Sequence, residues 1–149
     1  MKLSSRSRHA VSVMLELAQR DAKSETPIVD MAKKYNLSQS SMEQLFARLR
    51  KSGLVAGRRG RRGGYKLARN ADAISVAEII AAVDDESPAI RNRIAVSSAM
   101  GNSDNANVVW DCLSSKLYQS MGQISLADAI QMGQQDHEEV MDFSSENSF

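Results

Sequence analysis

The feature that most constrains the fold of this chain is a short polar break between two amphipathic stretches. Apolar residues recur at helical spacing on both sides of the break, at Ile28, Met31 and Ala32 and then at Met42, Leu45, Phe46 and Leu49. Asn36 suits the left-handed conformation that ends many helices, and Ser38 is a suitable N-cap for the next helix. The pattern predicts two helices joined by a tight turn, which is the helix-turn-helix arrangement.

The second predicted helix carries polar side chains at its start and basic ones at its end. The candidate contact residues are Ser38, Gln39, Ser40, Ser41, Glu43 and Gln44 at the start and Arg48, Arg50 and Lys51 at the end. In helix-turn-helix proteins the N-terminal part of the recognition helix reads base edges in the major groove, and basic residues nearby hold the phosphates. An ordinary amphipathic helix with a polar outer face would show the same pattern, so this helix does not decide the function alone.

The most basic stretch of the chain follows this helix and lies between two short apolar segments. Ser52 and Gly53 are expected to end the helix, and residues 54–56 and 65–67 to form the strands of a hairpin. The hairpin loop places four arginines among glycines, at Arg58, Arg59, Arg61 and Arg62. Arginine is drawn to the negative potential of narrow minor grooves. Helix-turn-helix and hairpin together predict a winged helix with a basic wing, and Tyr65 is expected to pack against the base of that wing.

The charge of the chain divides sharply near residue 70. Residues 1–70 hold 16 Lys and Arg against 5 Asp and Glu, a net charge of +11, whereas residues 71–149 hold 3 against 13, a net charge of −10. A random scatter of solvated charges is the alternative, but the asymmetry favours a basic half that binds nucleic acid. We expect a DNA-binding domain at 1–70, a helical dimerisation and regulatory region at 71–133 and a disordered acidic tail at 134–149.

The start of the chain argues against export. A first helix is predicted from Ser5 to Arg20, where charged residues are too frequent for a signal peptide. Its basic start, with Ser4, Arg6 and Arg8, either touches phosphates or is an exposed turn. No apolar run approaches the roughly 20 residues of a membrane span. We therefore expect a cytoplasmic protein that has no membrane segment.

Two further helices are expected in the acidic half, before a short last helix capped by Ser125. Residues 76–83 form the first, and residues 107–119 a longer one whose apolar stripe comprises Val108, Val109, Cys112, Leu113 and Leu117 and continues to Met121. A stripe of this length needs a partner surface. Cys112 is the only cysteine, so an internal disulfide is excluded and a reducing compartment is implied.

These motifs resemble the winged-helix repressor family that contains the iron–sulfur cluster regulator IscR and the regulators NsrR and CymR. The resemblance is carried by Met1-Lys2-Leu3, by Met42-Glu43-Gln44-Leu45-Phe46-Ala47-Arg48-Leu49-Arg50-Lys51-Ser52-Gly53-Leu54-Val55, by the wing, and by residues 74–85 and 110–130. It implies a mainly α fold with a small β-hairpin, namely a winged helix-turn-helix DNA-binding domain plus a long dimerisation helix.

The resemblance also implies roles for particular residues. Ser40, Glu43 and Gln44 would read bases, and Arg59 would enter the minor groove. Two copies would cross their long helices in a two-fold homodimer, and the dimer would repress transcription from a pseudo-palindromic operator in double-stranded DNA. A carboxylate accepts from a cytosine amino group but repels phosphate, so Glu43 would discriminate between sites more than it adds affinity.

The chain departs from the family pattern in the wing and in the loop at 86–106. The family usually has Arg-Gly-Pro-Gly-Gly-Gly-Tyr in the wing, where this chain places Arg61 and Arg62 at the proline and the following glycine. We expect tighter and more salt-sensitive DNA binding, because each added phosphate contact releases counterions. The family's cluster-ligand positions, three cysteines and a histidine in IscR, hold Asn92, Ser98, Asp104 and Asn107 here. Amides and a hydroxyl are poor ligands for an iron–sulfur cluster, so no cofactor is expected.

An unusual cluster or a redox-sensing thiol remains an alternative. Cys112, His9 and His137 are the available soft ligands, although a lone helical cysteine is more often a small buried hydrophobe. We thus expect a cluster-free, sequence-specific regulator of iron–sulfur, iron or redox-related genes that responds to an unidentified protein or small-molecule effector. The alternatives are a sensor ligated through Cys112 and a protein-interaction module built on a winged helix. No nucleophile–base pair, phosphate loop or metal motif indicates an enzyme.

Overall fold

A computed structural model describes residues 4–20, 25–57, 63–84 and 105–146 of the chain. In chain order the elements are α1 (Ser5–Gln19), α2 (Ile28–Lys34), α3 (Gln39–Lys51), β1 (Val55–Gly57), β2 (Tyr65–Leu67), the short 3-10 helix η1 (Ala71–Ala73), α4 (Val76–Val83), α6 (Asn105–Gln123) and α7 (Leu126–Glu146). The described part is therefore mainly α-helical with one antiparallel hairpin, which confirms the predicted fold class.

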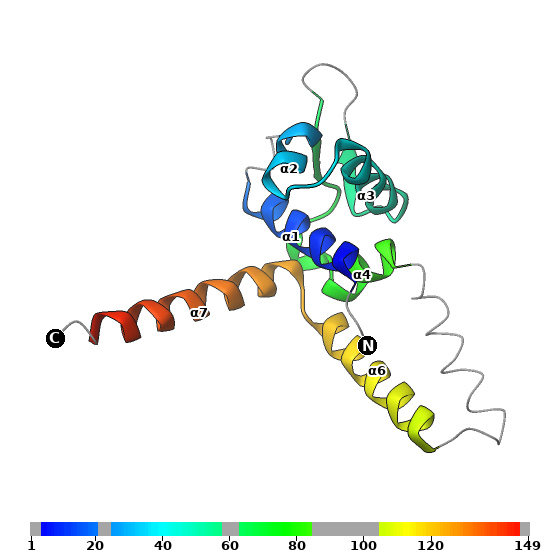
Figure 1. Cartoon of the computed structure of the whole chain (residues 1–149), viewed down its shortest axis with the longest axis vertical. Helices are drawn as coiled ribbons and strands as arrows, with labels where there is room; N and C mark the ends of the chain where they lie inside the picture. Colours follow the sequence, from blue (N-terminus) through cyan, green and yellow to red (C-terminus); the bar gives the residue numbers. More distant parts are fainter. Residues whose placement is uncertain (1–3, 21–24, 58–62, 85–104, 147–149) are drawn as a thin grey trace.

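The arrangement of these elements is that of a winged helix with two helical arms. Figure 1 shows α1, α2, α3 and the hairpin gathered in one body, with α4 beneath them. From the base of this body α6 and α7 extend in different directions, far from the side that carries the hairpin (Figure 1). α6 and most of α7, from the acidic half of the sequence, therefore lie away from the hairpin.

One hydrophobic core holds the body together, and it draws on both sides of residue 70. Its members from the N-terminal half include Met14 of α1, Met31 of α2 and Phe46 of α3, each at most 1% exposed. Ile79 of α4 and Leu126 at the start of α7 are fully buried in the same cluster. α4 and the start of α7 therefore pack against α1 and share the core of the winged helix.

The two turns that precede α4 and α7 are joined by backbone hydrogen bonds. Val76 donates to the carbonyl oxygen of Ile124 at 2.9 Å, and Leu126 donates to that of Ile74 at 2.8 Å. Both helices begin with the same device, in which a serine hydroxyl accepts from a backbone N–H three residues on and the acidic side chain there accepts from the serine N–H. This shared start fixes the direction in which each helix leaves the body.

The C-terminal prediction was wrong in one respect. The structure continues α7 to Glu146, whereas a short helix followed by a disordered tail from residue 134 was expected. Gly133 lies at the predicted boundary, but the acidic segment after it contains good helix formers and no proline, and α7 continues through it. α6 is likewise longer than the predicted 107–119, and β1 begins one residue later than predicted.

Candidate nucleic-acid interface

The turn between α2 and α3 is built by two local devices that the sequence predicted. Asn36 adopts a left-handed conformation with φ of 51°, and Leu37 donates to the carbonyl oxygen of Ala32 at 2.9 Å, closing α2. Ser38 then caps α3, since its hydroxyl oxygen accepts from the backbone N–H of Ser41 at 3.1 Å. These caps set the angle at which α3 leaves the turn.

α3 has one buried face and one exposed polar face. The buried face consists of Met42, Leu45, Phe46 and Leu49. The predicted base-reading residues Ser40, Glu43 and Gln44 are all exposed. The amide of Gln39 donates to Glu43 Oε1 at 3.0 Å, and the hydroxyl of Ser38 donates to that of Ser41 at 2.8 Å. The helix therefore presents a row of hydrogen-bonding groups to an external partner.

The basic end of α3 is only partly available to such a partner. Arg50 and Lys51 are exposed, as a phosphate contact requires. Arg48 is half-buried instead, and its Nη1 donates to the carbonyl oxygen of Val83 at 3.2 Å, which is the C-terminal end of α4. A guanidinium satisfies helix-terminal carbonyls well. Arg48 thus ties the recognition helix to α4, a long-range contact that its position in the sequence did not reveal.

The basic start of α1 also contacts the end of α4. The Nη1 of Arg6 donates to the carbonyl oxygen of Val83 at 3.5 Å, and the hydroxyl of Ser4 donates to Asp84 Oδ1 at 3.3 Å. Arg8 is exposed. Of the three candidate phosphate contacts at the start of α1, Ser4 and Arg6 therefore have partners within the fold. These bonds hold the start of α1 against Val83 and Asp84 at the end of α4.

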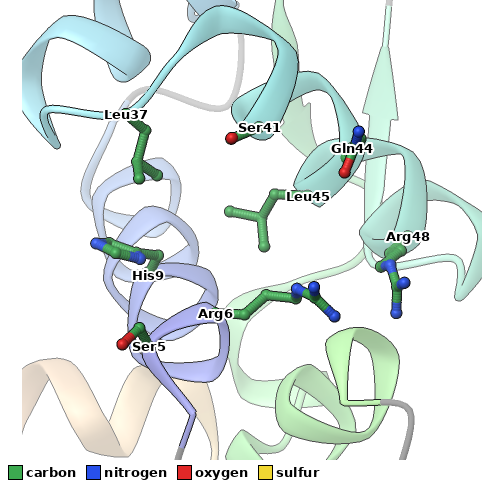
Figure 2. Close-up of a pocket in the computed structure, with 8 residues that line it drawn as sticks. All are labelled: Ser5, Arg6, His9, Leu37, Ser41, Gln44, Leu45 and Arg48. Atoms are coloured by element: carbon green, nitrogen blue, oxygen red, sulfur yellow. The ribbon is translucent and has the colours of Figure 1, made fainter.

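A cleft of roughly 220 Å³ lies between α1 and α3. It is lined by Ser5, Arg6, His9, Leu37, Ser41, Gln44, Leu45 and Arg48. Figure 2 shows Leu45 pointing from α3 toward α1, whereas His9 and Ser5 are turned outward. Arg6 and Arg48 both donate to the carbonyl oxygen of Val83, so these two polar tips are engaged within the fold at one end of the cleft.

The base of the wing lies next to α3. β1 and β2 pair with Val55 opposite Leu67 and Gly57 opposite Tyr65. The ring of Tyr65 stacks on that of Phe46, which confirms that it packs at the hairpin base. The four wing arginines, Arg58, Arg59, Arg61 and Arg62, lie outside the described residues. The described hairpin base consists of the paired strands β1 and β2 and lies beside α3 through the Tyr65–Phe46 contact.

An ionic cluster that the sequence did not reveal holds α2 on α1. The carboxylate of Glu16 lies 2.7 Å from Arg20 and 3.0 Å from Lys34, and it accepts a hydrogen bond from the Tyr35 hydroxyl at 2.9 Å. Burial raises the pKa of Glu16, but these three donors outweigh it, so that pKa lies below its ordinary value of 4.5. Burial and the adjacent carboxylate raise the pKa of Tyr35 to about 12.

The candidate sensor residues are not gathered into a site in the described part of the chain. Cys112 is exposed on α6, so the expectation of a buried cysteine was wrong for the single chain. His9 is half-buried at the cleft, and the side chain of His137 lies outside the described residues. Asn92, Ser98, Asp104 and the side chain of Asn107 also lie outside them. Within the described ranges no three His, Cys, Asp or Glu side chains could together hold a metal ion.

The predicted partner-seeking stripe on α6 is open to solvent. Val108, Val109, Leu113 and Leu117 are between 45% and 57% exposed. Large aliphatic side chains at successive helical turns form a continuous apolar strip, which costs free energy in water unless another surface covers it.

No described helix is long and apolar enough to cross a membrane.

Comparison with known proteins gives one consistent family. The Rrf2 family, described as iron-dependent transcriptional regulators, matches residues 3–132. The transcriptional regulators IscR of Xenorhabdus nematophila and of Yersinia pseudotuberculosis are 37% and 38% identical over 142 residues, or 95% of this chain and 84% and 85% of theirs. The structure is similar to that of T. potens IscR, with a TM-score of 0.70 and 29% identity over 89% of this chain and 88% of that one. It is also similar to CymR, the global cysteine regulator of B. subtilis, with a TM-score of 0.65 and 27% identity over 89% and 98% of the two chains.

Proposed function

Because this chain belongs to the Rrf2 family and is a DNA-binding transcription regulator, we propose that it acts as a homodimeric repressor that reads a pseudo-palindromic operator. The observation that carries the proposal is the exposed polar face of α3. Ser40, Glu43 and Gln44 lie exposed on a helix whose opposite face is anchored in the core. Rigid support of this kind is what a base-reading helix requires, since a misplaced donor loses its hydrogen bond.

The wing supplies the second contact of the proposed complex. Arg58, Arg59, Arg61 and Arg62 follow directly on a hairpin base that packs beside α3. Arg59 would enter the minor groove next to the major-groove contact of α3, and the other arginines, with Arg50 and Lys51, would neutralise phosphates.

A second copy of the chain is the proposed partner of α6. Val109, Leu113 and Leu117 would be covered by the same strip of the other copy, because a two-fold axis makes a surface patch complementary to itself. The dimer would place two recognition helices on two half-sites of one operator. The acidic helix α7 would face away from the DNA phosphates, which repel it.

The proposed regulator works without the iron–sulfur cluster of its relatives. The donor set of this chain does not fit such a cluster, which requires thiolate or imidazole ligands, whereas the corresponding positions hold Asn92, Ser98, Asp104 and Asn107. We propose that the signal is another effector and that the relatives' role as regulators, without catalysis, applies here. Protein purified without oxygen should show no visible charge-transfer bands and no stoichiometric iron or sulfide.

A redox-responsive regulator is a second candidate, supported by the exposure of the Cys112 thiol on α6. In this case oxidation would change DNA affinity in the wild type but not in Cys112→Ser. Equal affinities for the reduced and oxidised wild type would remove this candidate.

The experiment for the main proposal compares two glutamine substitutions on the same selected duplex. Gln44→Ala removes a base-reading amide and should weaken specific binding roughly tenfold or more. Gln19→Ala removes an exposed amide at the far end of α1 and should have no effect. Equal affinities of the two variants would contradict base reading by α3. Failure of the wild type to retard any duplex at low salt would instead favour a protein-interaction module.

A further inference from the structure

The first residue of β2, Tyr65, lies where three parts of the winged helix meet. Its ring stacks on Phe46 of α3, with ring centroids 4.4 Å apart and an interplanar angle of 20°. Phe46 is fully buried in the core, so the recognition helix offers the Tyr65 ring a rigid surface. This pair connects α3 directly to the strand that leaves the wing.

The opposite strand of the wing is adapted to the same ring. Gly57, the last residue of β1, pairs with Tyr65, and a Cβ at Gly57 would lie only 2.7 Å from Tyr65 Cε1. Real Cβ atoms do not approach a ring carbon this closely, so any larger residue would displace the ring. The ring therefore contacts the strand that enters the wing as well as the helix.

The third contact fixes the wing to the segment before α2. Tyr65 and Thr26 exchange two backbone hydrogen bonds, of 3.0 and 3.1 Å, as an isolated antiparallel bridge. The preceding residue, Gly64, passes so close that an added Cβ would lie 2.4 Å from the carbonyl oxygen of Thr26. Since Thr26 is followed by Pro27 and α2, the end of the wing is attached to both helices of the helix-turn-helix.

We propose that Tyr65 is a positioning residue that fixes the wing relative to the recognition helix and so sets the base-pair distance between the major-groove and minor-groove contacts. The inference rests on the proposed function, because it takes α3 and the wing as the two DNA contacts. Six residues, 58–63, separate Gly57 from Gly64 in the sequence, and the contacts of Tyr65 hold the base of the hairpin on three sides.

The geometry of DNA makes this distance measurable. Moving an A·T tract by one base pair displaces it by about 3.4 Å and rotates it by about 35° around the axis. A wing that is fixed on α3 cannot follow such a move and loses its contact, whereas a loosened wing can follow it. The loss of affinity when the A·T tract is moved, which we call the spacing preference, therefore measures how rigidly the wing base is held on α3.

The test uses the full chain and the duplex that it enriches from a random pool. Affinity for this duplex is compared with affinity for duplexes in which the A·T tract is moved by one base pair. Wild type and Tyr65→Phe, which keeps the ring, should both lose roughly tenfold or more in affinity on the displaced versions. Tyr65→Leu should bind the best duplex more weakly and lose less than about threefold on displacement. A thermal melt verifies that each variant is folded, and Gly57→Ala, which displaces the same ring, replaces Tyr65→Leu if that variant does not fold.

The outcomes separate the inference from the proposed function. A folded Tyr65→Leu with the same sharp spacing preference as the wild type would overturn the positioning role and leave the DNA contacts in place. Wild type with no spacing preference, and Arg59→Ala that binds like wild type, would overturn the wing contact itself and with it the inference.

Discussion

Replacing Tyr35 by phenylalanine should loosen the attachment of the helix-turn-helix to α1. The Tyr35 hydroxyl donates toward Glu16 Oε2 at 2.9 Å and toward the carbonyl oxygen of Ser12 at 3.1 Å, and phenylalanine keeps the ring but removes both contacts. The substitution leaves the exposed face of α3 unchanged. Its effect on stability therefore measures the clamp between α1 and α2.

The size of the effect follows from the partners of the hydroxyl. A hydrogen bond to a charged acceptor contributes about 1.5 to 3 kcal/mol. The lower end applies because Glu16 keeps its ion pairs with Lys34 and Arg20, and the Lys34 side chain is 59% exposed and screened by solvent. We expect Tyr35→Phe to lower the free energy of unfolding by about 1.5 kcal/mol, a shift in Tm of about 3 to 6 °C for a chain of this length.

Urea unfolding at fixed protein concentration, followed by circular dichroism across pH, tests both partners. The pKa of Glu16 is lower in the folded state than its ordinary 4.5, so its contribution is fully present above pH 4.5 and is lost as pH falls through the folded value. Glu16→Gln should show a smaller acid-dependent loss than the wild type, because the pKa values of Glu78 and Asp128 are also lowered and their contributions remain. The pKa of Tyr35 is raised to about 12 from 10, so stability should decline as pH rises from 10 toward 12, and Tyr35→Phe should not show this decline.

Tyr118→Phe is the matched control. The Tyr118 hydroxyl donates to the neutral carbonyl oxygen of Ala77 at 3.1 Å, so its loss should cost about 1 kcal/mol. It should leave the acid-dependent loss of stability unchanged. An unfolding midpoint of Tyr35→Phe equal to that of the wild type, or an acid-dependent loss in Glu16→Gln as large as in the wild type, would refute the clamp.

Three further predictions concern DNA binding and assembly. The double substitution Arg61→Pro/Arg62→Gly should reduce the slope of log affinity against log salt by about 3.6 for the proposed dimer, since it removes two arginines from each subunit and each neutralised phosphate contributes about 0.9. An unchanged slope would show that neither arginine contacts a phosphate. Arg48→Met should lower the unfolding midpoint in urea and change the salt slope of DNA affinity little, because Arg48 binds the end of α4. Arg50→Met should reduce the salt slope and change the unfolding midpoint little. Identical behaviour of the two variants would contradict this division of roles at the end of α3. Leu117→Asp should convert the dimer to a monomer in sedimentation velocity, and a persistent dimer would exclude the α6 strip as the interface.

The features predicted best from the sequence are those set by neighbouring residues. Asn36 ends α2 in a left-handed conformation, Ser38 caps α3, and β2 spans residues 65–67 as predicted. Capping and turn formation depend on side chains within a few positions of the backbone groups they satisfy, so a single sequence contains the necessary information.

The features that were missed depend on residues far apart in the chain. The carbonyl oxygen of Val83 accepts a hydrogen bond from Arg48 of α3, and Thr26 pairs with Tyr65 of β2 across 39 positions of sequence. Glu16 and Tyr35 meet only because α1 and α2 pack together. An arginine at a helix end looks the same in sequence whether it faces a phosphate or a carbonyl group, so the structure was needed to separate Arg48 from Arg50.

Selection of bound duplexes from a random pool by the full-length protein tests the central claim most directly. The account predicts that the pool converges on a two-fold symmetric site with A·T base pairs at the positions of the wings, and that Gln44→Ala loses this enrichment while Gln19→Ala keeps it. A pool that remains random after repeated rounds at moderate salt, or one that converges equally well with Gln44→Ala, would contradict sequence-specific recognition by α3.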